Sequence, residues 1–405
     1  MEITALEILF CKKIHKDIDD TQSLAEKINV NKSLLYDVEA GRRSMSISLF
    51  NKITKYYGIT YDHDESLYDE AYDTLIKLFQ LYISYQIDEL YKLYDSYKAK
   101  QAIYENSKAF IFVDLINAIY YLKKYEYDEV KHCINNCKDY LEIYDNNIIY
   151  LYTIVWIVTK KMYQDLVEIK AFLMPIYKKY SFADIDPYIK AMLYFQIGRI
   201  TELGGNEIEA LPYFDKSMNC YYKLNIHQRV VQNEIQKATC YFTLKQYSLA
   251  EKTYLEAYEE SLKHNYKFRL IPCCNNLAFL YFVQQDYDNT LKFIEQARKY
   301  GSTFPDLNYY EAYIIYQRES KLIARRKIKK LIETENDVRI IHTLKFIQAM
   351  LNENDKNIEK YFAYCLEDNQ KINAQLDLEL IYKMAISYYK LHDKNRAYEL
   401  METIL

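Results

Sequence analysis

Two sets of polar side chains in this 405-residue chain have the types and spacing needed to bind another molecule. The first set lies between residues 21 and 43, where hydroxyls and amides are followed by two adjacent arginines. Such groups donate hydrogen bonds to phosphate oxygens and to base edges, so this set predicts contact with a double-stranded DNA operator. Its members are Thr21, Gln22, Asn31, Lys32, Ser33, Tyr36, Asp37, Arg42 and Arg43.

The second set lies between residues 196 and 279 and is rich in carboxamides and arginines. A carboxamide can accept from a peptide N–H and donate to a peptide C=O, so a row of them can hold an extended peptide of any sequence. Arginines at this site would bind a peptide carboxylate. The alternative is that the amides face water and the arginines pair with acids such as Glu234. The members are Gln196, Arg199, Arg229, Gln232, Asn233, Gln236, Arg269, Asn275, Asn276 and Phe279.

Catalytic and metal-binding patterns are weak by comparison. The chain has no GxSxG, Walker, HExxH or GxGxxG motif, and its 7 histidines are scattered singly, so we expect neither an enzyme nor a cofactor. The 8 cysteines form no CxxC pair, which is typical of small apolar side chains in a reducing compartment. His132, Cys133 and Cys137 could share a helix face and bind zinc, but no second pair matches them, which favours a structural role.

The elements that position the first set form the pattern of a helix-turn-helix. Leu24 and Ala25 mark the buried face of a first short helix, and Leu35 and Val38 mark that of a second. The second helix would then present its polar residues outward as a sequence-reading helix. A similar pattern also arises in small helical bundles that bind no DNA, so the residues that follow the second helix decide between these readings.

Those residues resemble the DNA-binding domain of phage repressors. Glu39 and Gly41 match the Glu-x-Gly that ends the recognition helix of that family, and Arg42 and Arg43 follow where a basic residue usually meets phosphate. Thr21 stands where the family often has a phosphate-binding Gln, and we expect it to cap the first helix and donate to phosphate.

The charge of the first 60 residues is low for a DNA-binding domain, with nine Lys and Arg against eight Asp and Glu. A weakly charged domain makes few phosphate contacts, so we expect two copies to act together as a homodimer. No apolar stretch is long enough to span a membrane, and the first ten residues carry two acids and no long apolar run. We therefore expect a cytoplasmic protein that makes no membrane contact.

A helical repeat begins near residue 70. The composition, with 6 Gly, 5 Pro and 50% apolar residues, favours a nearly all-helical chain, and the 46 tyrosines predict aromatic packing between helices. Small residues recur with the spacing of tetratricopeptide repeats, most clearly at Gly198, Ala238 and Ala278, and about nine helical hairpins fit the sequence. Such hairpins stack into a right-handed superhelix whose inner wall is a peptide groove. We expect this wall to include Phe195, Arg199, Ile235, Thr239, Asn275 and Phe279.

The order of these parts resembles the RRNPP family, the peptide-pheromone receptors of Gram-positive bacteria. We assign residues 1–60 to the helix-turn-helix domain, 61–73 to a linker and 74–405 to a repeat domain for peptide sensing and dimerisation. The resemblance implies a homodimeric transcription regulator in quorum sensing, whose repeat domain binds a short signalling peptide that changes operator binding. In that family, asparagines on inner helices hold the peptide backbone, and Asn233, Asn275 and Asn276 match that placement.

Two other functions stay open at this point. One is a phage lysis–lysogeny regulator of the arbitrium type, which would bind a phage operator. The other is a protein-interaction adaptor in which the N-terminal bundle is only structural. The exposed basic residues predicted between positions 32 and 43 favour DNA binding over the adaptor.

Overall fold

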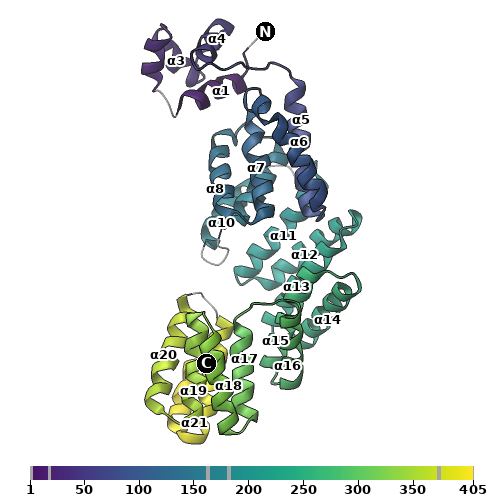
Figure 1. Ribbon diagram of the computed structural model, residues 1–405, viewed down its shortest axis with the longest axis vertical. Coiled ribbons are helices and arrows are strands. Elements are labelled where there is room, and N and C mark those ends of the chain that lie inside the picture. The colour runs from purple at the N-terminus through teal and green to yellow at the C-terminus, as the bar shows by residue number, and fades with distance from the viewer. Residues whose placement is uncertain (1–2, 17–19, 161–164, 180–183, 372–374, 405) are drawn as a thin grey trace. The chain divides into compact units, whose positions relative to one another are not determined.

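Figure 1 shows the computed structural model, which describes residues 3–16, 20–160, 165–179, 184–371 and 375–404. These residues form 22 α-helices, one 3₁₀ helix and no strand, which confirms the all-α prediction. The chain divides into two compact units: an N-terminal unit of residues 1–160 and 173–192, and a C-terminal unit of residues 161–172 and 193–405. No helix of the described residues is both long enough and apolar enough to cross a membrane.

Four short helices form the N-terminal bundle. They are α1 (Ala5–Lys16), α2 (Thr21–Lys27), α3 (Lys32–Glu39) and α4 (Ile47–Tyr56). The apolar faces predicted for the helix-turn-helix are buried, since Leu24, Ala25, Leu35 and Val38 are each no more than 1% exposed. The α2–turn–α3 arrangement therefore follows from the spacing of apolar residues.

Nine helical hairpins follow the bundle within the described residues, as the repeat pattern predicts. The first three are α5 (Ser66–Ile83) with α6 (Ile87–Glu105), α7 (Phe110–Lys124) with α8 (Tyr127–Asn136) and η1 (Cys137–Tyr140), and α9 (Asn146–Val158) with α10 (Leu166–Lys179). The next three are α11 (Pro187–Leu203) with α12 (Glu207–Lys223), α13 (His227–Thr243) with α14 (Tyr247–Lys263), and α15 (Lys267–Val283) with α16 (Tyr287–Lys299). The last three are α17 (Asp306–Arg318) with α18 (Lys321–Thr334), α19 (Val338–Leu351) with α20 (Asp355–Lys371), and α21 (Gln375–His392) with α22 (Lys394–Ile404).

Small residues allow the two helices of a hairpin to cross closely. A Cβ added at Gly198 of α11 would lie 2.8 Å from Cε1 of Phe214 on α12, so the ring occupies the space that a side chain would need. Ala238 and Ala278 hold the position that corresponds to Gly198, Ala250 holds the small position on the partner helix, and all three are fully buried. The crossings are thus where the sequence pattern places them.

Several turns between helices use left-handed residues other than glycine. Lys245 (φ 60°) and Gln285 (φ 63°) close the turns within two hairpins, and Asn225 (φ 56°) and Asn265 (φ 55°) close the turns that lead into α13 and α15. The backbone N–H of Lys245 donates to the carbonyl of Phe242 at 2.9 Å, which ends α13 in hydrogen-bonded geometry. A chain with 6 glycines can therefore form this many turns.

An aromatic cluster packs the N-terminal bundle against the first hairpins. The ring of Phe10 on α1 lies 4.7 Å from Tyr61 and 5.5 Å from Phe110 on α7, and Phe110 lies 5.4 Å from Tyr140. These contacts agree with the prediction that tyrosines serve packing. The segment 61–73, predicted as a linker, begins inside this cluster, and its second half is the start of α5.

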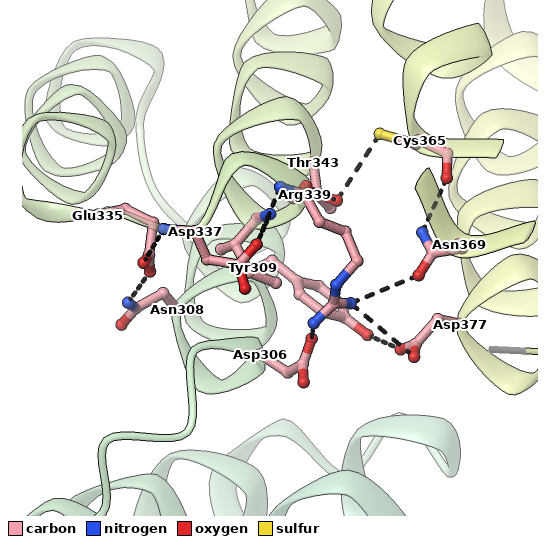
Figure 2. Close-up of polar contacts among 11 residues, drawn as sticks. Asp306, Asn308, Tyr309, Glu335, Asp337, Arg339, Thr343, Cys365, Asn369 and Asp377 are labelled. Carbon is pink, nitrogen blue, oxygen red and sulfur yellow. Dashed lines mark hydrogen bonds and ion pairs between the residues drawn. The ribbon is translucent and has the colours of Figure 1, made fainter. Parts of the chain in front are cut away.

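A buried ionic cluster joins α17, α19 and α21 in the C-terminal unit, as Figure 2 shows. The guanidinium of Arg339 donates to Asp306 at 2.5 Å and lies 4.0 Å from the carboxylate of Asp377. The hydroxyl of Tyr309 donates to Asp377 at 2.5 Å. Burial raises the pKa of Asp306 to about 6, although the charge of Arg339 opposes this shift. One cation thus binds a buried acid, Asp306, and a half-buried acid, Asp377, from different hairpins.

Candidate functional site

The N-terminal turn of α3 exposes the residues predicted to contact bases. Lys32 and Ser33 are exposed, and Tyr36, one turn later, is 46% exposed. Asn31 caps this helix, because its side-chain oxygen accepts from the backbone N–H of Ser33 at 2.9 Å. Gln22 on α2 is also exposed, and its amide donates to Glu26 at 3.3 Å. The α3 surface therefore offers an ammonium, a hydroxyl and a phenol to a ligand.

Thr21 is not the cap of α2, so that part of the sequence prediction is wrong. The cap is Asp20, whose carboxylate accepts from the backbone N–H of Ser23 at 2.7 Å. The hydroxyl of Thr21 donates instead to Glu39 at 2.9 Å and so joins α2 to α3. Asp20 takes the capping position because its backbone is extended there (φ −78°, ψ 161°). A phosphate contact by Thr21 would have to replace its bond to Glu39.

The two adjacent arginines have different surroundings. Both Nε and Nη2 of Arg42 lie 2.9 Å from Oδ1 of Asp37, so these two members of the first set form an ion pair. Arg43 is exposed and forms no ion pair within the described residues. Exposed pairs are weak in water, so Arg42 can exchange Asp37 for another anion. Arg43 can bind an anion directly, because its exposed side chain has no carboxylate to exchange among the residues that the structure describes.

Arg199 and Gln236 of the second set meet between α11 and α13. The guanidinium of Arg199 donates to the amide oxygen of Gln236, and its Nη1 lies 3.2 Å from the carboxylate of Glu202. Burial raises the pKa of Glu202, and the charge of Arg199 opposes that shift. Gln236 also belongs to a periodic series, since Gln196 and Asn276 precede and follow it by 40 residues at the same position of the hairpin. The spacing of 40 residues places the three carboxamides at equivalent positions of successive hairpins, so the sequence itself marks them as one group.

The two recurrent arginines share one carboxamide. Nη1 of Arg229 donates to Oε1 of Gln232 at 2.9 Å, and Nη2 of Arg269, from α15, donates to the same oxygen at 3.0 Å. A ligand carboxylate in place of this neutral amide would form stronger, charge-assisted bonds. Glu234, the acid considered as an alternative partner, lines a cavity together with Glu260.

The three asparagines differ in how far they are exposed. Asn233 is fully buried, and its amide donates to the backbone carbonyl of Arg229 at 2.8 Å. Asn275 is half-buried and accepts from the hydroxyl of Ser302 at 2.9 Å. Asn276 is half-buried as well. A peptide can reach Asn275 and Asn276 at the surface, whereas Asn233 lies inside the hairpin and supports Arg229.

Apolar residues expected on the groove wall belong to the core instead. Phe195 is 7% exposed and Ile235 is 2% exposed, so the expectation that they line a groove is wrong. Phe279 is half-buried, and its ring lies 5.1 Å from Phe242 and 5.6 Å from Tyr310 on the neighbouring hairpins. Contacts between successive hairpins use these side chains, because each hairpin must bury its apolar face against the next.

Two of the three residues considered for zinc, Cys133 and Cys137, are packing residues, whereas His132 is exposed. Cys133 and Cys137 are buried, and burial raises the pKa of the Cys133 thiol to about 12 and that of Cys137 well above its ordinary value. Thiols with such pKa values stay protonated at neutral pH. Across the part of the chain that the structure describes, no three His, Cys, Asp or Glu side chains are grouped to hold a metal ion.

Solved structures of two other proteins are similar to this chain. The apo form of the quorum sensor NprR from B. thuringiensis has a TM-score of 0.60 at 14% identity, with 83% of this chain and 99% of that chain covered. The apo form of RapI has a TM-score of 0.61 at 13% identity, with 82% and 96% covered. NprR in complex with its cognate peptide NprX has a TM-score of 0.58 at 15% identity, with 83% and 98% covered.

Sequence comparison gives no further relative, since no protein-family model and no curated protein matches the chain. At the identities of the structural matches, the likeness establishes the fold. The chain thus has the helical-repeat fold of NprR and RapI, as the sequence analysis predicts.

Proposed function

We propose that this chain is a cytoplasmic, peptide-responsive transcription regulator of the RRNPP type and not an enzyme. One observation carries the proposal: a helix-turn-helix with an exposed polar α3 precedes a repeat fold that is shared with NprR, a quorum sensor solved with its cognate peptide. The first feature supports DNA binding, and the second supports peptide binding.

In this proposal α3 enters the major groove of an operator. Lys32 and Ser33, in the first turn of α3, would reach base edges, because the N-terminal residues of a recognition helix lie deepest in the groove. Arg43 would bind phosphate, and Arg42 would join it after exchanging Asp37 for a phosphate oxygen.

We expect Lys32→Ala to weaken binding to the specific site by about 1 to 3 kcal/mol, because it removes a base contact. Arg43→Ala should weaken binding to all duplexes alike and reduce the salt dependence, because phosphate contacts carry no sequence information. The measurement is fluorescence anisotropy with two duplexes of equal length: one selected from a random library by the full chain, and one unselected.

Lys52→Ala is the matched control, since Lys52 is an exposed cation on α4 outside the proposed interface. Equal losses from Lys32→Ala on both duplexes would contradict the base-reading role. Failure to select any duplex would favour the protein-interaction adaptor.

A homodimer follows from the weak charge of the N-terminal bundle, because two bundles are needed for tight operator binding. We expect inverted half-sites whose centres are separated by roughly 10 to 10.5 base pairs or a multiple of that spacing. Light scattering should give twice the mass of the chain at micromolar concentration. A monomer that protects a single half-site in a footprint would contradict this prediction.

We propose that the peptide binds along α11, α13 and α15. Arg229 and Arg269 would bind a carboxylate of the peptide in place of Gln232, whose freed amide would then hold the peptide backbone. Asn275 and Asn276 would extend these backbone contacts along α15. Because successive hairpins pack on one another, small rotations caused by the peptide would add along the array and so change operator binding.

A further inference from the structure

We propose that a groove between α16 and α18 binds an acidic, amphipathic segment of a partner protein. The groove is a cavity of about 580 Å³ lined by residues of α16, α17 and α18. Figure 1 labels these three helices. It lies within the C-terminal unit and uses none of the residues assigned to DNA or peptide binding. The inference is therefore independent of the proposed function.

The charge of α18 is the first observation. Its 14 residues hold six Lys and Arg and one Glu, in a chain whose net charge is −4. Four cations line the groove against two acids, Glu311 and Glu319. These cations are Arg298, Arg318, Lys327 and Lys330. An occupant with carboxylates is the one that complements this lining.

Existing ion pairs leave the groove able to exchange partners. Lys327 lies 2.7 Å from Glu319, and Arg298 lies 2.8 Å from Glu311. Lys330 is exposed and forms no ion pair in the described part of the chain. The acids of both pairs are half-buried, but Lys327 and Arg298 are exposed, so carboxylates of a partner can reach both cations.

Apolar surface is the second observation. Leu291, Ile314 and Leu331 line the groove among the cations. On α18, Leu322 is 71% exposed and Ile323 is 45% exposed. Ile323 stands four residues before Lys327, on the helix face that includes this groove residue, whereas Leu322 stands four residues before Arg326, outside the groove. A partner that buries apolar side chains and presents carboxylates beside them fits both observations.

This combination favours a protein segment over other polyanions. A DNA backbone presents phosphates and gains little from an apolar floor. A membrane surface requires a continuous apolar face, whereas the two exposed apolar residues of α18 are adjacent and are followed by Arg325 and Arg326. A concave groove with an apolar floor and a charged rim is typical of sites that receive an amphipathic helix.

The test uses the full chain and a fluorescein-labelled synthetic peptide. The peptide is designed as an amphipathic helix, with Leu residues on one face and Glu residues on the other. We expect saturable binding that the double variant Lys327→Glu with Lys330→Glu weakens by about tenfold or more. The matched control is Arg326→Glu with Lys329→Glu, which makes the same charge change on the same helix outside the groove. It should keep affinity to within about threefold, because diffuse attraction is screened by salt. Circular dichroism spectra should show that both variants keep the helical content of the parent.

Four results would overturn the inference. They are no saturable binding of the peptide, equal losses in the two double variants, equal binding of polyglutamate without Leu, and tighter binding of a DNA duplex or of vesicles containing phosphatidylserine that the Lys327→Glu and Lys330→Glu changes abolish. The third result would show that the apolar floor is unused, and the last would assign the groove to a different class of partner.

Discussion

Replacing Arg339 by Gln is expected to destabilise the C-terminal hairpins by about 3 to 5 kcal/mol. The substitution leaves the buried carboxylate of Asp306 and the half-buried carboxylate of Asp377 without their shared cation (Figure 2). Thermal unfolding of the full chain, followed by circular dichroism, measures the effect. Lys321→Gln is the control, because Lys321 and Glu353 form an ion pair whose two side chains are both exposed, where loss of an ion pair costs about 0 to 1 kcal/mol.

The cost of Arg339→Gln should depend on pH in a defined direction. The pKa of Asp306 is raised from 3.8 to about 6 in the folded chain, so the folded state binds this proton more tightly than the unfolded state. Its contribution to the free energy of unfolding therefore falls as pH rises from about 4 to about 6. At pH 5 the carboxyl is mostly protonated and needs Arg339 less. The difference between the variant and the parent should thus be smaller at pH 5 than at pH 7.5, and a larger difference at pH 5 would contradict this role for Asp306.

Arg269→Gln is expected to weaken binding of a peptide ligand by about 1.5 to 3 kcal/mol, because it removes a charge-assisted hydrogen bond to a carboxylate. The ligand is selected from short random peptides displayed against the full chain, and isothermal calorimetry measures its affinity. Lys267→Gln is the matched control, since Lys267 is an exposed cation on the same helix. Equal losses in both variants would show that general attraction, and not the site shared by Arg229 and Arg269, holds the peptide.

The hairpins could be predicted from sequence because each crossing has a local signature. A small residue such as Gly198 and a large residue such as Phe214 stand at fixed separations, and burial of both repeats along the chain. The buried face of the helix-turn-helix was predictable for the same reason. In each case the pattern lies within one hairpin or one pair of helices, so its period is visible in the sequence.

Contacts between distant or competing residues were not predictable in this way. Asp306, Arg339 and Asp377 come from three hairpins, and no period relates them. The cap of α2 was misassigned because Asp20 and Thr21 are adjacent residues of types that both cap helices, and the backbone decides between them. Asn233 has the residue type of a peptide ligand, but its phase on α13 places it inside the hairpin.

In the proposed function, a single chain couples peptide binding to operator binding. The most direct test measures, by anisotropy, the affinity of the full chain for its selected duplex with and without a saturating selected peptide. We expect the two affinities to differ by about 5- to 150-fold, a coupling of about 1 to 3 kcal/mol, and the duplex to change peptide affinity by the same factor. Identical DNA affinities in the absence and presence of bound peptide would contradict the account.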